Sequence, residues 1–265
     1  MQSTPEGLEI SDTAQIDPSV KFGPNCKNIS IGHGAILRRD VYIDVETLYI
    51  GDYVTIHHGV VIHGIKVSIG HNCWVGHYSI LDGHGGELRI GNNVGIGAQS
   101  QLWSHMKFGD TLAGCNWKSE GKLIIGDDAW LVGHCIVSPI VIHPKAMLLV
   151  GSVATKDLLE NHIYAGTPAK DVSETMGHQF SERSKDEIES NWNSLICQYK
   201  DLGNDVAFIN TVEEIGGLGR SDSHTIFSPH ERRYVPNYGY DETKFMRFLL
   251  YDKAKFLPSS GTTQF

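Results

Sequence analysis

The sequence predicts a mainly β, three-sided solenoid in which short parallel strands stack coil upon coil. Three observations support this: an apolar residue recurs every six positions, these residues group in threes, and small residues form a second column. A repeat of fixed period is the signature of stacked repeat architectures. Seven triplets keep the step of six and begin at Ile10, Ile31, Ile50, Ile69, Ile90, Ile125 and Ile142. We therefore expect about seven coils, each with three flat sides.

The second column lies four residues after the aliphatic positions. Residues of one parity share one face of a strand, so both columns point inward. The aliphatic residues fill the core and the small ones lie at the corners. Examples of the small column are Ala35, Val54, Cys73, Ser100 and Cys135. Exceptions such as Lys66, Gly85 and Met106 coincide with the one irregular corner, from which the longest loop, residues 103–124, is extruded.

The chain changes character after the repeats. We expect a β-solenoid domain over residues 1–172 and a small α-rich extension over residues 173–265. Ser184 and Glu187 have the spacing of a capping box, and apolar residues follow on one helical face, which predicts a helix over 184–200. Asp241 is expected to cap a last helix. The polar stretch 216–240 is typical of an irregular loop.

Composition excludes several classes of protein. The 265 residues carry a formal net charge of −9, which argues against a nucleic-acid surface. No apolar run approaches the ~18 residues of a membrane helix, and the N-terminus lacks the pattern of a signal peptide. We therefore predict no integral membrane segment. The five cysteines show no Cys-x-x-Cys spacing, which favours a reducing, cytoplasmic setting.

Six segments are similar to motifs of a known family, and the Trp-Leu, Gly-Ser-Val-x-Thr-Lys-Asp and Gly-x-Pro-Ala-Lys elements among them are more specific than the repeat itself. They are Ile80-Leu-Asp-Gly-His-Gly-Gly86, Ile90-Gly-Asn-Asn-Val-Gly-Ile96, Leu102-Trp-Ser-His105, Ile125-Gly-Asp-Asp-Ala-Trp-Leu131, Gly151-Ser-Val-Ala-Thr-Lys-Asp157 and Ala165-Gly-Thr-Pro-Ala-Lys170. Over about residues 10–172 the chain resembles bacterial hexapeptide-repeat acyltransferases, most closely the sugar O-acetyltransferases of surface-polysaccharide biosynthesis. This resemblance implies a left-handed parallel β-helix, an exception to the usual right-handed crossover. It also implies a homotrimer with active sites between subunits.

The register gathers polar side chains at the irregular corner. Asp44, His63, Asp82 and Trp103 each follow a third aliphatic position, and His105 lies two residues beyond Trp103. A neutral imidazole is suited to deprotonating a hydroxyl near pH 7. The resemblance places the family's catalytic base at His105, and Asp82, Trp103 and His63 are expected to bind the sugar. The structural alternatives are an exposed loop histidine, corner packing and a turn aspartate.

The resemblance also implies acetyl-CoA as cosubstrate, bound along the last coils. The residues that it assigns to the cofactor are Trp130, Gly133, Ser152, Thr155, Lys156 and Lys170. A lysine at position 156 would lie near the nucleotide phosphates, where a compact positive charge is favourable. The alternatives are that Trp130 only packs and that Lys156 is a solvated turn residue. The acceptor would be a saccharide or a nucleotide-linked or lipid-linked sugar.

Three other interpretations stay open. An amine on a nucleotide-linked amino sugar could be the acceptor instead of a hydroxyl. The segments around His63 and His77 also resemble γ-class carbonic anhydrases, whose zinc needs three histidines; here Asp82 stands at the third position. The acyltransferase interpretation includes no metal. The third alternative is a catalytically silent scaffold. Histidines 33, 58, 71, 77 and 134 are expected at the surface.

Overall fold

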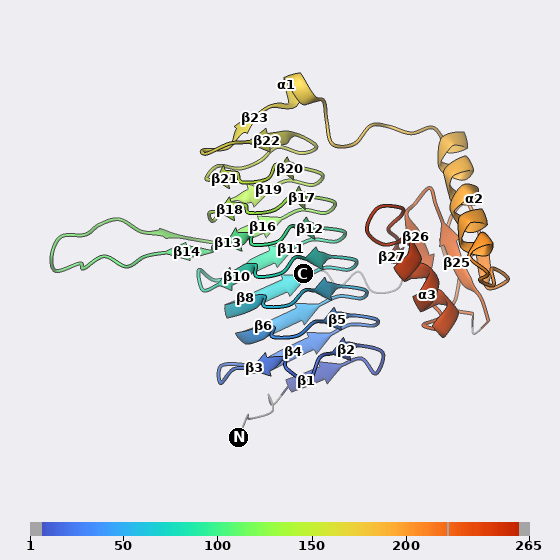
Figure 1. Cartoon of the computed structure of the whole chain (residues 1–265), viewed down its shortest axis with the longest axis horizontal. Coiled ribbons are helices and arrows are strands. Elements are labelled where there is room, and N and C mark those ends of the chain that lie inside the picture. Colours follow the sequence, from blue (N-terminus) through green and yellow to red (C-terminus); the bar gives the residue numbers. More distant parts are fainter. Residues whose placement is uncertain (1–6, 222, 260–265) are drawn as a thin grey trace. The chain divides into compact units, whose positions relative to one another are not determined.

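The computed structural model describes residues 7–221 and 223–259, and Figure 1 shows how the elements are arranged within each part. The chain divides into two compact units, the first ending at Phe180 and the second beginning at Ser181. The first unit consists of stacked β coils. The second unit combines helices with a small sheet.

One side of the coil stack is a nine-stranded sheet. Its strands are parallel neighbours except for the last pair, β22 and β23, which is antiparallel. In stacking order they are β2 (Gln15–Ile16), β5 (Ile36–Leu37), β7 (Thr55–Ile56), β9 (Trp74–Val75), β12 (Gly95–Ile96), β17 (Trp130–Leu131), β20 (Met147–Leu148), β22 (Ile163–Ala165) and β23 (Lys170–Asp171).

The other two sides belong to one twelve-stranded sheet, because two long strands run through a corner and join them. These strands are β6 (Tyr42–Ile50) and β8 (Val61–Ile69). The side at their C-terminal ends also contains β1 (Gly7–Ile10), β4 (Asn28–Ile31), β11 (Leu88–Ile90), β16 (Leu123–Ile125) and β19 (Val141–Ile142). The side at their N-terminal ends contains β3 (Lys21–Phe22), β10 (Ile80–Gly83), β13 (Gln101–Leu102), β18 (Ile136–Val137) and β21 (Val153–Ala154).

Strand pairing follows the six-residue register. Ile43 pairs with Ile62, Ile62 with Leu81, Leu81 with Leu102, and Leu102 with Val137. These side chains are buried in one continuous core, and small residues of the second column such as Cys73 and Cys135 are buried with them. Burying each such aliphatic side chain contributes about 1.5–3 kcal/mol. The mainly β, parallel, stacked-coil fold predicted from the sequence is confirmed.

An arm leaves the stack between β13 and β16. Its base is a short antiparallel pair, β14 (His105–Met106) with β15 (Ser119–Glu120). Figure 1 shows the arm projecting from the side of the coils. His105 is therefore the first residue of the arm, and it lies where the arm joins the coil.

The first unit ends in the short helix α1 (Ser173–Met176), and the second begins with helix α2 (Lys185–Asp201). Ser184 and Glu187 form a complete capping box at the start of α2, which confirms the helix predicted there. Helix α3 (Tyr240–Leu249) packs on α2 through an aromatic core that includes Trp192 and Phe245. The unit's sheet has the order β24 (Ile209–Thr211), β25 (Thr225–Ser228), β26 (Arg233–Val235) and β27 (Leu257–Pro258).

Two expectations about the second unit were wrong. The stretch 216–240 contains β25 and β26, so it is not an irregular loop. All four residues of β25 are buried, and the alternation that marks a half-buried strand is therefore missing from its sequence. Asp241 does not cap α3: the helix begins at Tyr240 after Gly239, so Asp241 lies in the first turn. An acidic residue there still interacts favourably with the helix dipole.

Two of the histidines expected at the surface are buried. His33 and His71 are each 8% exposed. The His33 ring lies 2.7 Å from the hydroxyl of Thr13, and His71 Nδ1 accepts the backbone N–H of Asp52 at 2.9 Å. Polar residues of adjacent coils cover these rings, which the spacing within one coil could not reveal.

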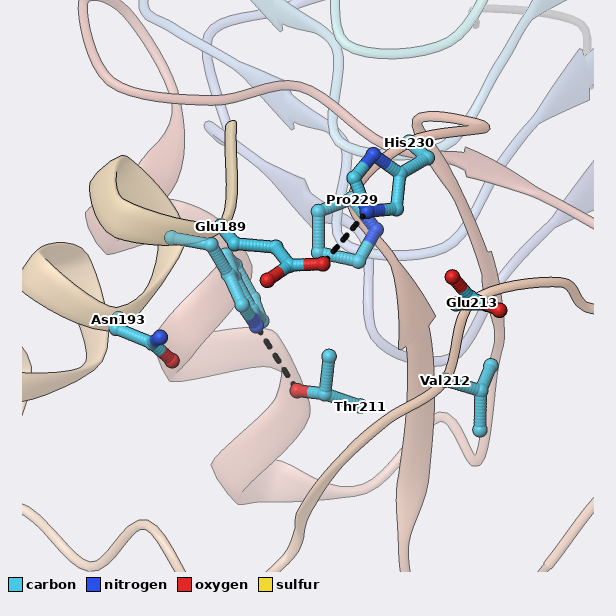
Figure 2. A pocket seen from close by; sticks show the side chains of 8 residues that line it. Glu189, Asn193, Thr211, Val212, Glu213, Pro229 and His230 are labelled. Atoms are coloured by element: carbon cyan, nitrogen blue, oxygen red, sulfur yellow. Dashed lines mark hydrogen bonds and ion pairs between the residues drawn. The ribbon is translucent and has the colours of Figure 1, made fainter. Parts of the chain in front are cut away.

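Among residues 7–221 and 223–259, no helix has the length and apolar character that crossing a membrane requires. The second unit contains a cavity of about 240 Å³, shown in Figure 2. His230 Nε2 lies 3.2 Å from the Glu189 carboxylate beside this cavity, and the Trp192 indole N–H donates to the Thr211 hydroxyl. None of the site residues predicted from the sequence lines this cavity.

Candidate functional site

The polar column predicted at the irregular corner exists. Strand pairing sets Asp44 beside His63 and His63 beside Asp82 in successive coils. Neighbouring strands lie about 4.8 Å apart, so side chains in such a column can touch. His105 comes from the next coil, where the arm starts. The structure thus brings together His63, Asp82 and His105.

Asp82 is the centre of this cluster, and none of it is exposed to solvent. Its Oδ2 lies 2.8 Å from His105 Nδ1 and accepts the hydroxyl of Ser104 at 2.8 Å. The backbone N–H groups of Ser104 and His105 also donate to Oδ2, at 3.0 and 3.2 Å. Its Oδ1 lies 2.8 Å from His84 Nδ1. Both carboxylate oxygens are therefore occupied by groups of the chain itself.

The environment keeps Asp82 ionised. Burial raises the pKa of a carboxyl group, but hydrogen bonds from His105, His84 and Ser104 outweigh it and lower the pKa of Asp82 to about 2. Because a carboxylate can only accept hydrogen bonds, the Nδ1 of neutral His105 must carry the hydrogen. Its Nε2 then has a free lone pair. This is the tautomer of a histidine that acts as a base.

Sequence reasoning missed two members of the cluster, His84 and Ser104. Ser104 also accepts the backbone N–H of Gly85 at 2.7 Å. A Cβ added at Gly85 would collide with the Ser104 carbonyl oxygen, which explains why the small column has no side chain there. Both residues belong to motifs that the sequence analysis singled out: His84 lies two residues after Asp82, and Ser104 directly precedes His105. The missing signal was the turn that folds them back onto the carboxylate.

The other predicted sugar-binding residues border the cluster. The rings of His63 and Trp103 lie 6.4 Å apart, edge to face, and the Trp103 indole N–H donates to Gln101. Burial lowers the pKa of His63, although the nearby Asp82 carboxylate opposes this. Asp44 is not part of the cluster, because its carboxylate accepts the backbone and side-chain N–H groups of Asn25.

Two of the predicted cofactor residues share this corner of the stack. Thr155 and Lys156 directly follow β21, which stacks on β18 and, through it, on β13. They therefore lie two strand spacings beyond Trp103, roughly 10 Å along the corner. Both side chains are exposed to solvent.

The remaining cofactor residues lie elsewhere on the last coils. Trp130 is exposed on β17 of the nine-stranded sheet, and Gly133 follows at the next turn with φ +148. Ser152 is buried and accepts the backbone N–H of Gly166 at 3.0 Å, so it holds the exit turn. Lys170 is exposed on β23.

A second charged group stands at the base of the arm. The Glu87 carboxylate is 5% exposed and lies 3.0 Å from Lys66, 3.3 Å from Arg89 and 3.3 Å from Lys122. Burial raises the pKa of Glu87, but the hydrogen bonds from both lysines and the charge of Arg89 lower it overall. Because Lys122 lies where the arm returns to the coil, this group fastens the arm.

No family model matches the chain. One similar solved structure is that of a mutant of AntD, an N-acyltransferase from Bacillus cereus, in complex with dTDP and coenzyme A. It is 16% identical to this chain, has a TM-score of 0.47, and matches 72% of this chain and 92% of its own. The polySia-specific acetyltransferase NeuO is 15% identical, has a TM-score of 0.37, and matches 76% of this chain and 98% of its own. The hexapeptide-repeat acetyltransferase VCA0836 from Vibrio cholerae, in complex with acetyl coenzyme A, is 14% identical and has a TM-score of 0.31. The match covers 58% of this chain and 69% of VCA0836. At such identities the similarity concerns the fold.

Replacing Glu87 tests how the arm is fastened. Glu87→Gln leaves three cations without their carboxylate and should lower the free energy of unfolding by about 1–2 kcal/mol at neutral pH. The folded-state pKa lies below the ordinary 4.5, so the carboxylate stabilises fully above that pH and progressively less as the pH falls. Denaturant unfolding at a series of pH values should therefore show the variant and the wild type converging in acid.

Glu120→Gln is the matched control, because Glu120 also forms an ion pair at the base of the arm, with Lys107, but both side chains of that pair are exposed to solvent. We expect no measurable change in stability for this variant. A Glu87→Gln protein as stable as the control at neutral pH would contradict the role of Glu87.

Proposed function

We propose that the chain is an acetyltransferase that moves an acetyl group from acetyl-CoA to a sugar hydroxyl, with His105 as general base. The observation that carries this proposal is the 2.8 Å contact between His105 Nδ1 and the buried Asp82 carboxylate. An imidazole oriented by a buried carboxylate, with its other nitrogen free, is a recurrent arrangement for activating a hydroxyl. The His105 side chain is 25% exposed, so a substrate can reach it.

In the proposed reaction, His105 Nε2 takes the proton of the sugar hydroxyl as its oxygen attacks the thioester carbonyl. A carbon–oxygen bond forms and gives a tetrahedral intermediate. This intermediate collapses with loss of the coenzyme A thiolate, which takes the proton from the imidazolium. Asp82 stabilises the imidazolium through Nδ1 while it exists. The products are the acetylated sugar and coenzyme A.

This mechanism changes the role first expected for Asp82. Its oxygens are buried and already hydrogen-bonded to His105, His84 and Ser104, so the carboxylate is not available to a sugar hydroxyl. We assign it to positioning His105. Trp103 and His63 keep their proposed role at the sugar, where an aromatic ring face can pack on a pyranose.

For the cofactor, Thr155 and Lys156 lie in the same corner as His105, and an exposed ammonium group there suits the phosphates of acetyl-CoA. Trp130, Gly133, Ser152 and Lys170 stay proposed cofactor residues on the resemblance of their motifs. The homotrimer is proposed on the same resemblance, and the cytoplasmic location is proposed because the five cysteines show no Cys-x-x-Cys spacing.

We do not adopt the γ-class carbonic anhydrase interpretation, because only two of its three ligand positions, His63 and Asp82, lie together in this chain. His77 lies with His57 and His58, whereas His63 lies with Asp82 and His84. A nucleotide-linked amino sugar stays open as the acceptor, and the assay below separates it from a hydroxyl acceptor.

His105→Ala should lower kcat for a hydroxyl acceptor by about 100-fold or more, because general base catalysis contributes 10²–10⁴-fold. Release of coenzyme A thiol with a panel of sugars measures the rate. His224→Ala, which removes an exposed histidine of the second unit, should leave the rate unchanged. A His105→Ala enzyme with more than a tenth of wild-type activity would contradict the base. If amino sugars alone are acetylated, the N-acetyltransferase interpretation replaces the one proposed.

Lys156→Ala should weaken binding of acetyl-CoA about fivefold, the value of one solvent-exposed ion pair of about 1 kcal/mol. Calorimetry measures this against acetyl-pantetheine, which lacks the nucleotide phosphates and should bind both proteins equally. Lys21→Ala, on β3 at the other end of the stack, is the control variant. Equal affinity of wild type and Lys156→Ala for acetyl-CoA would remove Lys156 from the site.

A further inference from the structure

Three donor atoms converge on one point of the corner, beside Asp82 Oδ1. They are His63 Nδ1, His84 Nδ1 and Asp82 Oδ1. The two imidazole nitrogens lie 3.1 Å apart. Asp82 Oδ1 lies 2.8 Å from His84 Nδ1 and 3.6 Å from His63 Nδ1. No other residue described in the structure contributes a donor to this triangle of potential metal ligands.

The size of this triangle fits a zinc ion. Zinc binds imidazole nitrogen and carboxylate oxygen at about 2.0–2.2 Å in tetrahedral geometry, which sets neighbouring ligand atoms about 3.3–3.5 Å apart. The three observed separations, 2.8, 3.1 and 3.6 Å, bracket that ligand–ligand distance. Small rotations of the three side chains would make the three separations equal.

In one arrangement of the imidazole hydrogens this triangle leaves a nitrogen lone pair free for a cation. The carboxylate oxygen can only accept, and two Nδ1 atoms 3.1 Å apart cannot both donate to each other. If His84 donates its Nδ1 hydrogen to Asp82 Oδ1, a neutral His63 that carries its hydrogen on Nε2 directs a lone pair into the same space. A cation placed between the three atoms would satisfy all of them.

We propose that His63, Asp82 and His84 form a zinc-binding site with one open coordination position. Two imidazoles and one carboxylate are a donor set suited to zinc and related transition metals, whereas magnesium and calcium prefer oxygen ligands. The side chains of His63 and His84 are 24% and 47% exposed, so the metal can enter and the fourth position faces solvent. Water or a substrate oxygen would occupy it.

The surroundings hold the carboxylate in place for this role. Asp82 Oδ2 accepts the hydroxyl and the backbone N–H of Ser104, and it contacts His105 Nδ1. Such contacts from outside the ligand set orient metal ligands in proteins. The metal would replace the hydrogen bond between Asp82 Oδ1 and His84 Nδ1, whereas His105 keeps its contact with Oδ2, so the zinc site and the pairing with His105 are compatible.

A second histidine cluster provides an internal comparison. His57, His58 and His77 also bring three ring nitrogens near one another. The rings of His58 and His77 are stacked, with an interplanar angle of 14°, so their nitrogens do not point at a common centre as ligands of one ion do. We therefore place the metal at His63, Asp82 and His84.

The test is zinc titration of the full-length, chelator-treated protein against a chromophoric chelator. Wild type should bind one zinc per chain, and His84→Ala should bind it at least about 100-fold more weakly. Cobalt(II) in place of zinc should give the visible absorption of a four-coordinate site in wild type and lose it in His84→Ala. Thermal unfolding of both proteins without metal shows whether the variant is folded, and His84→Gln serves if it is not.

Three further variants make the result specific. His224→Ala should leave zinc affinity unchanged. His77→Ala should also leave it unchanged, and a loss there would move the metal to the other cluster and overturn the proposal. His105→Ala should keep zinc binding within about tenfold while it loses acetyl transfer, which separates this site from the proposed function. Wild type that takes up no zinc, or His84→Ala with wild-type affinity, would overturn the proposal.

Discussion

The corner of the β-solenoid is organised by one buried carboxylate. A charged group without exposure to solvent is tolerated only when hydrogen bonds and opposite charge compensate for its lost hydration. Asp82 meets this requirement with the hydroxyl and backbone N–H of Ser104, the backbone N–H of His105 and two imidazoles. The same contacts that stabilise the charge also fix the orientation of His84 and His105. The hydrogen bonds to Asp82 therefore both stabilise the buried charge and set the geometry of the site.

The solenoid supplies the rest of the constraint. Each coil repeats the position of the one before it, so residues that follow the third aliphatic position fall into a column with the spacing of neighbouring strands. A rigid stack fixes such a column accurately, and the arm adds His105 to it from the next coil. Glu87, with its three cations, fastens the return of the arm beside this column. The interruptions of the repeat are thus where the chain can place polar groups that the regular core excludes.

Much of this could be predicted from the sequence, because the register is a local and periodic signal. It predicts the stacked coils, the core positions and the meeting of His63, Asp82 and His105. It does not predict His84 and Ser104 in the cluster, because both lie in turns whose path depends on contacts between coils. The inward orientation of Asp82 was equally hidden, since a turn aspartate and a buried hydrogen-bond acceptor look alike in sequence. The second unit was predicted least well, since β25 and β26 are short and lack alternation.

The central claim is that Asp82 holds His105 with its hydrogen on Nδ1 and a free lone pair on Nε2. Long-range ¹H–¹⁵N correlation spectra of the histidine side chains test this directly in the chelator-treated protein, with His105→Ala identifying the signals. We expect the nitrogen shifts of a neutral His105 that carries its hydrogen on Nδ1. A neutral His105 with the hydrogen on Nε2 would contradict the account, because that nitrogen could not accept a proton from a substrate.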